Sequence, residues 1–180
     1  MRSSSSSGWP RRARRWTGCR AYGNALLASN RAEEAIGRFD AEIASNPAAL
    51  SARLGRANAL RQLKRPEEAL AALDAVLKTA PRESMAVMLR GWALLDLARH
   101  DQALATFELL LADRDDNGQA MLGRGLALAA LGRRSEAIGA LQKLVEQQPN
   151  NRRAAAELAR LRGTPAASGQ LPAVSAPPTR

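Results

Sequence analysis

A period of 34 residues runs through most of the chain and constrains its fold more than any other feature. Alanine recurs at Ala35, Ala69, Ala103 and Ala137. Each of these alanines has a small residue 12 positions before it, a leucine 9 before it, and Phe or Leu 4 after it. Self-similarity at a fixed period of this length is typical of arrays in which each unit packs against its neighbours.

Each unit contains two blocks of apolar residues spaced three or four apart, a pattern that predicts two amphipathic helices. A polar turn separates the blocks near Asn30, Lys64, Ala98 and Gly132. Acidic residues such as Glu67 open the second block, where they face the positive end of the helix dipole. Proline follows the second block in three of the four units and cannot continue a helix. Each unit is therefore predicted to be a helical hairpin.

Residues at the same place in successive units form a column, and the columns of this chain resemble the pattern of the tetratricopeptide repeat (TPR) family, whose unit is a helical hairpin of the same length. The resemblance covers residues 16–149 in register, without an insertion. It implies an all-α fold, a right-handed solenoid of TPR hairpins. The chain departs from the family pattern where a large aromatic is usual and where Asp115 replaces one proline. The residues in the aromatic column are Cys19, Arg53, Val87 and Met121.

The register divides the chain into four hairpins, a closing helix and two ends. Ala154, Leu158 and Leu161 recur at helical spacing after the last hairpin, and Gly163 is a stop signal. This segment is predicted to be the capping helix that repeat arrays require. The predicted boundaries are 1–15 for a disordered basic leader, 16–49, 50–83, 84–117 and 118–151 for the hairpins, 152–163 for the cap, and 164–180 for a disordered Pro/Ala-rich tail.

The net charge of +10 comes from the two ends of the chain. Residues 1–20 contain six arginines and no acid, and residues 152–180 carry a net charge of +4, whereas residues 21–151 contain 16 basic and 16 acidic side chains. No apolar run has the length of a signal sequence or a membrane span. We therefore expect a cytoplasmic location, with lipidation at Cys19 or export only if the chain starts elsewhere than Met1. The 24 arginines against three lysines favour a GC-rich bacterial source.

Two groups of residues have side chains suited to catalysis or metal binding, and neither forms a complete motif. His100 is the only histidine and has no nucleophile or base in a recognisable pattern around it. Residues 113–118 match the opening of a calcium-binding loop, but the twelfth position, normally a bidentate glutamate, is Arg124. We expect a turn in which Asp116 or Asn117 caps the next helix. No catalytic residue, metal or cofactor is predicted.

The leader, residues 1–15, mixes arginines with Trp9, and Trp16 follows it directly. Such a mixture can stack on nucleic-acid bases or lie on an anionic membrane. The alternative function is therefore attachment to a polyanion through this leader, with the repeat array as a spacer. Nucleic acid or membrane is not expected to bind elsewhere on the chain.

The predicted functional site is one face of the first helices of the hairpins. Columns that keep one residue type in all units are held by packing, whereas columns that vary are available to a ligand. The variable columns lie three or four residues apart and therefore share a face. The resemblance implies that this face lines a concave groove that takes a peptide or amphipathic segment of a partner protein. The predicted groove residues are Arg20, Asn24, Leu54, Asn58, Arg61, Met85, Met88, Leu89, Trp92, Leu122 and Leu126.

Trp92 is the predicted anchor of the groove, because tryptophan is enriched among residues that dominate binding energy. On that basis Trp92→Ala is expected to weaken binding by about 2 kcal/mol with little change in helicity. The alternative is that Trp92 packs against the next repeat or against a second copy of the chain. Met85 and Leu89 stand where chaperone-binding members of the family carry basic residues, so the resemblance does not imply a clamp for a C-terminal carboxylate.

Overall fold

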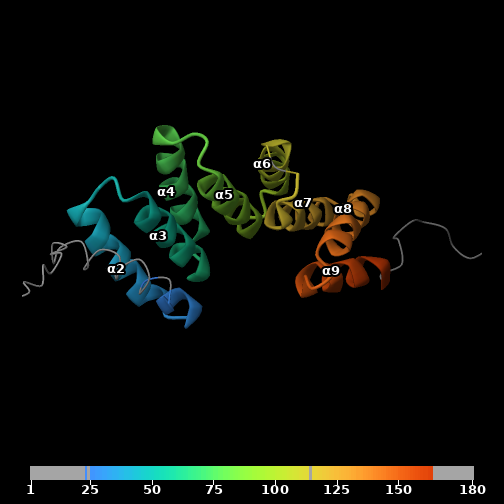
Figure 1. The fold of residues 1–180 in the computed structure, drawn as a ribbon, viewed down its shortest axis with the longest axis horizontal. Coiled ribbons are helices and arrows are strands. Elements are labelled where there is room, and N and C mark those ends of the chain that lie inside the picture. The colour runs from blue at the N-terminus through green and yellow to red at the C-terminus, as the bar shows by residue number, and fades with distance from the viewer. Residues whose placement is uncertain (1–22, 24, 114, 164–180) are drawn as a thin grey trace, which may run out of the picture.

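The computed structural model describes residues 23, 25–113 and 115–163, and all regular secondary structure in these ranges is helical (Figure 1). The predicted all-α solenoid is confirmed. The predicted leader and tail, residues 1–15 and 164–180, lie outside the described residues. The described helices are α2 (Ala32–Ser45), α3 (Leu50–Gln62), α4 (Pro66–Thr79), α5 (Ser84–Asp96), α6 (His100–Asp113), α7 (Gly118–Ala130), α8 (Arg134–Gln147) and α9 (Arg152–Gly163).

The helices form two layers of an arch (Figure 1). Each helix packs on the next one along the chain, and α3, α5, α7 and α9 also pack on one another in that order. Among the described residues, the even-numbered helices make no such contacts with one another. We call α3, α5, α7 and α9 the inner layer, and α2, α4, α6 and α8 the outer layer.

The 34-residue period sets the start of every inner helix. These helices begin at Leu50, Ser84, Gly118 and Arg152, which are 34 residues apart. The last of them, α9, packs on α7 and α8, with Ala154, Leu158 and Leu161 buried and its four arginines exposed. A terminal helix of this kind covers the apolar end of the array, which would otherwise face water.

The core is built around two phenylalanines, Phe39 and Phe107, which have no exposed surface. Phe107 lies between two glycines of the inner layer. A Cβ atom on Gly91 would lie 2.7 Å from Cζ of the ring, and one on Gly123 would lie 2.5 Å from Cε1. In the same way, a Cβ atom on Gly55 would lie 2.6 Å from Cε1 of the Phe39 ring. These glycines are therefore required by the size of the rings, because a methyl group at such distances would overlap them.

One repeat before Phe107, the same space is filled with a different set of volumes. Leu73 occupies the column of the phenylalanines, while Ala57 and Leu89 occupy the columns of Gly91 and Gly123. A smaller outer side chain is thus matched by larger inner ones, as a close-packed core requires. The backbone repeats every hairpin, while Phe and Leu alternate in the outer column as Phe39, Leu73, Phe107 and Leu141.

The turn inside each hairpin contains one residue with a left-handed backbone. Its φ is 58° at Asn30, 59° at Lys64, 55° at Ala98 and 76° at Gly132. In all four turns the next amide donates to the carbonyl five residues earlier, with N···O distances of 2.8–3.0 Å. This geometry satisfies carbonyls at the end of the first helix. The predicted ends of the first helices are confirmed.

Ala98 is poorly suited to its turn, because a Cβ atom disfavours the left-handed conformation. We expect Ala98→Gly to raise the free energy of unfolding by about 0.5–1 kcal/mol. Gly132→Ala, the reverse change in the equivalent turn, should lower it by a similar amount. Urea unfolding followed by circular dichroism measures both. A stabilising effect of Gly132→Ala would contradict this account of the turns.

Charge is divided between the two layers. The inner helices carry nine arginines, three in α3, one each in α5 and α7, and four in α9, against two carboxylates, Asp96 and Glu157. The outer helices carry twelve carboxylates against four arginines or lysines. The neutral balance of residues 21–151 therefore conceals a positive inner layer and a negative outer layer, and α9, beyond that range, supplies four of the nine inner arginines.

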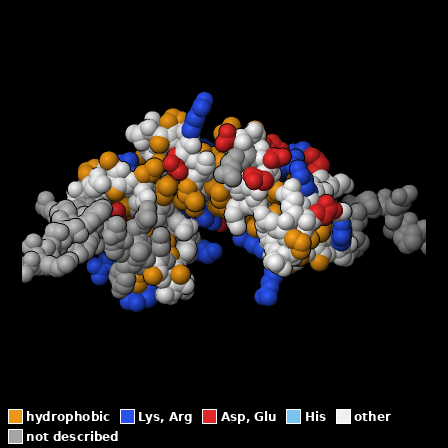
Figure 2. Space-filling model, in the orientation of Figure 1, with side chains coloured by type: hydrophobic (Ala, Val, Ile, Leu, Met, Phe, Trp, Pro, Cys, Tyr) orange, Lys and Arg blue, Asp and Glu red, His pale blue; other side chains and the backbone are white. Residues whose placement is uncertain are grey.

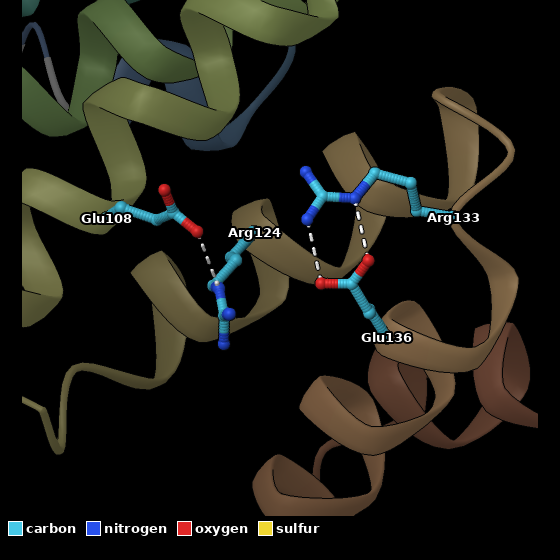
Figure 3. Close-up of polar contacts among 4 residues, drawn as sticks. All are labelled: Glu108, Arg124, Arg133 and Glu136. Atoms are coloured by element: carbon cyan, nitrogen blue, oxygen red, sulfur yellow. Dashed lines mark hydrogen bonds and ion pairs between the residues drawn. The ribbon is translucent and has the colours of Figure 1, made fainter.

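Ion pairs connect the layers in register with the repeat. An arginine of each of α3, α5 and α7 meets a carboxylate of the preceding outer helix, 16 residues earlier in the chain. Figure 3 shows the last of these pairs. Because the side chains are partly exposed, each pair is worth about 1 kcal/mol or less. The pairs are Asp40–Arg56 at 2.6 Å, Asp74–Arg90 at 2.7 Å and Glu108–Arg124 at 3.3 Å.

A second set of ion pairs lies at the start of the outer helices. Arg133 donates to both carboxylate oxygens of Glu136, at 2.8 and 2.7 Å (Figure 3). The hydrogen bond from the arginine lowers the pKa of Glu136 below its usual value, and the equivalent bonds do the same for Glu34 and Glu68. A lowered pKa stabilises the fold above the ordinary pKa of about 4.5, and this contribution is lost as the pH falls through the lowered value. Because these carboxylates are fully exposed to solvent, their contribution to the stability of the fold is small.

Candidate functional site

The inner layer presents a strip of half-buried side chains along α3, α5 and α7. Leu54, Met88 and Leu126 pack against the core with one side and keep the other partly exposed. Met85 is the most open apolar side chain of the strip, at 49% exposed. We call the following set the inner strip. Its members are Leu54, Asn58, Arg61, Met85, Met88, Leu89 and Leu126.

Two qualifications apply to the predicted groove residues. Arg20 and Asn24 lie outside the described residues. Leu89 stands in the column in which Gly55 and Gly123 meet the outer-layer phenylalanines, so its column serves packing between the layers. Leu89 therefore contributes to packing between the layers as well as to the inner strip.

Trp92 and Leu122 form the floor beneath the inner strip. Trp92 is 8% exposed and Leu122 is 2% exposed, so the prediction that they offer an open contact surface is wrong. The Trp92 ring meets the Phe107 ring edge-on, with centroids 5.4 Å apart and an interplanar angle of 68°. Because Phe107 is fully buried, Trp92 belongs to the same core.

Two arginines from distant parts of the chain lie over the Trp92 ring. The guanidinium carbon of Arg153, in α9, is 5.2 Å from the ring centroid, and that of Arg61, in α3, is 6.0 Å from it. Arg61 also pairs with Asp96 of α5 at 2.8 Å. Side chains of three inner helices therefore converge on one ring, and cation–π attraction favours this arrangement.

Sequence reasoning missed Arg153 as a site residue, although a signal was present. Continuing the 34-residue register into the capping helix places Arg153 in the column of Met85, which is one of the groove columns. The last repeat of an array is atypical, so its columns are easily left out of such a comparison.

The space-filling view shows how hydrophobic and basic side chains are distributed over one face of the molecule. Hydrophobic side chains gather over α4 and α5, and arginine or lysine side chains extend into the hollow below the arch (Figure 2). A separate hollow of about 460 Å³ lies between the turn before α5 and the end of α6. Leu109, 66% exposed, lines that second hollow, which is outside the inner strip.

Of the other candidate sites, the turn before α7 has a structural role. Asn117 caps α7, since its Oδ1 accepts a hydrogen bond from the amide of Ala120 at 3.1 Å. This is one of the two caps that the sequence predicted. Over the described ranges no three metal-ligating side chains come together, and no helix there has the length and apolarity to cross a membrane. His100 begins α6, and its Nδ1 is buried without a hydrogen-bond partner among the described residues.

The stacked hairpins with a half-buried inner strip define a helical-repeat protein. The chain belongs to the tetratricopeptide repeat family, whose model matches residues 21–86 and 88–152. Each match spans about two hairpins, as does the alternation of Phe and Leu in the outer column. Members of this family are generally non-catalytic modules that mediate protein–protein interactions. No curated protein matches the sequence.

Solved structures show the same fold. The thermophilic TPR protein TTC0263 of Thermus thermophilus is 23% identical and superposes with a TM-score of 0.75, covering 82% of each chain. MamA 41-end from Desulfovibrio magneticus RS-1 is 23% identical, with a TM-score of 0.70 over 86% of this chain and 85% of the other. The Arabidopsis OM64 TPR domain is 24% identical, with a TM-score of 0.59 over 63% of this chain and 94% of the domain. At these identities the likeness is one of fold.

Proposed function

We propose that this protein is a non-catalytic scaffold whose inner strip holds a segment of a partner protein. The observation that carries the proposal is the row of partly exposed apolar side chains, Met85, Met88 and Leu126, on the inner layer of a TPR solenoid. Methionine adapts its shape to different ligands, which suits a surface that binds a short amphipathic segment. The buried Trp92 packs beneath these side chains, so the base of the surface is already formed without a partner.

A charge placed on the inner strip should abolish this binding. Peptides would first be selected on the full chain from a random 12-residue display library and then made synthetically. We expect Met88→Glu to weaken their binding about tenfold or more, because it puts a carboxylate against apolar partner atoms. Isothermal titration calorimetry measures the affinities.

Leu109→Glu is the matched control, because it adds the same charge to an exposed leucine outside the inner strip. It should change the affinity by less than about twofold, as surface changes away from an interface usually do. Circular dichroism and urea unfolding establish that both variants are folded. Equal losses in the two variants would place binding elsewhere, and a library that yields no binder would oppose the proposal as a whole.

The alternative, attachment to a polyanion through residues 1–15, rests on residues outside the described ranges. It remains a prediction from the sequence. A second copy of the chain is a further candidate for the occupant of the inner strip, and sedimentation of the purified protein distinguishes it from a different partner.

A further inference from the structure

We infer that the segment held by the inner strip is acidic, and that Arg153 binds one of its carboxylates beside Trp92. Arg61 lies over the same ring. This inference rests on the proposed function, because it names the chemistry of the segment that the inner strip would hold. It is carried by the charge of the inner layer and by the geometry around Trp92.

The inner layer has more positive charge than its own carboxylates can neutralise. Its two carboxylates, Asp96 and Glu157, are already paired with Arg61 and Arg160. Arg56, Arg90 and Arg124 are paired with the outer layer. Arg153 has no carboxylate partner among the described residues, and it lies where three inner helices converge. Arg153 therefore adds a positive charge beside the inner strip that no inner-layer carboxylate neutralises, and such a charge attracts a segment of opposite sign.

The contact between Arg153 and Trp92 prepares the guanidinium group for a carboxylate. A cation–π contact orients the side chain and leaves its N–H groups able to donate. A guanidinium with these donors matches the two oxygens of a carboxylate. The guanidinium carbon of Arg153 already lies 5.2 Å from the centroid of the Trp92 ring. Binding a carboxylate therefore costs less conformational entropy than it would for a freely rotating arginine.

Nucleic acid, the other polymer that arginine recognises, fits this site less well. Single-stranded nucleic acid is held by bases stacked on exposed aromatic rings. Trp92, the aromatic side chain of the site, is 8% exposed and already covered by two arginines. The neighbouring side chains, the exposed Met85 and the half-buried Met88, are apolar and flexible, and they suit aliphatic side chains placed between carboxylates.

The experiment uses the same random 12-residue library, selected on the full chain and on its Arg153→Gln variant. We expect peptides enriched on the wild type to carry a net negative charge together with apolar residues. For the best of them, Arg153→Gln should weaken binding about tenfold, the effect of losing one charge-assisted hydrogen-bonded pair. Replacing the acidic residues of the peptide by their amides should produce a similar loss, and the loss should shrink at high salt.

Arg162→Gln is the matched control, because it removes the same charge from the same helix. Arg162 donates to Oε1 of Gln142 in α8 at 2.7 Å, so it points to the outer layer. It should change the affinity by less than about twofold. If Arg153→Gln behaves like Arg162→Gln, the inference is wrong.

The remaining outcomes separate this inference from the proposed function. Enrichment of neutral or basic peptides that still require Met88 would overturn the acidic segment and leave the protein-binding scaffold standing. Peptides that require neither Arg153 nor Met88 would overturn both. Binding of a 20-residue oligothymidylate that depends on Arg153, in the absence of peptide binding, would show that the ligand is nucleic acid and would also overturn the inference.

Discussion

Gly123→Ala is expected to lower the free energy of unfolding by about 2 kcal/mol, although alanine normally stabilises a helix interior relative to glycine. The reason is the Phe107 ring, because the new methyl carbon would lie 2.5 Å from its Cε1 atom. The ring cannot withdraw, since Gly91 confines it on another side and its surface is completely buried. Urea unfolding followed by circular dichroism at 222 nm measures the change.

Two variants test the cause of this loss. Gly139→Ala in α8 has no atom within 4 Å of the new methyl group, so it should stabilise the protein by about 0.5–1 kcal/mol. Phe107→Leu should be less harmful in the Gly123→Ala background than alone, because it reproduces the combination found one repeat earlier, where Leu73 and Leu89 occupy the columns of Phe107 and Gly123. If the two changes are simply additive, the ring is not the source of the penalty.

Trp92→Ala is expected to lower the free energy of unfolding by about 3 kcal/mol or more, as removal of a buried aromatic side chain usually does. The change deletes the edge-on contact with Phe107 and leaves a cavity beneath the inner strip. It also removes the ring over which Arg61 and Arg153 lie. Any loss of peptide binding by this variant would therefore combine a local and a structural effect. Chemical denaturation measures the stability before binding is compared.

Met88→Ala is the appropriate comparison, because Met88 is only partly buried and lies above the same floor. It should cost about 1 kcal/mol, since less apolar surface is lost. If Trp92→Ala destabilises the protein less than Met88→Ala does, the buried position of the tryptophan is contradicted. In that case the initial prediction of an exposed anchor would be restored.

The repeat pattern was sufficient to predict the secondary structure and the stacking of the hairpins. A fixed period places the same side chains on the same face of every helix, so the core alanines and the turn residues recur together. The left-handed residues Asn30, Lys64, Ala98 and Gly132 lie at the predicted ends of the first helices. A cap by Asp116 or Asn117 was also predicted, because it depends only on the first turn of the helix that follows, and Asn117 provides it.

The candidate site was predicted only in part, since a pattern gives the direction of a side chain but not its depth. Met88 and Trp92 lie on the same predicted face of α5, yet one is half-buried and the other is 8% exposed. The difference arises from neighbours distant in the sequence, since Arg61 of α3 and Arg153 of α9 cover the ring.

The sequence by itself therefore determined the local features of this protein: its helices, their turns and the register in which hairpins stack. These depend on residues within one hairpin or its immediate neighbour. Only the tertiary structure decided that Trp92 supports the inner strip and that α9 brings Arg153 to it. It also showed that the charges of a nearly neutral array are separated into two layers. The physical reason is that burial and electrostatic pairing depend on how the hairpins curve together in space, which a one-dimensional period does not specify.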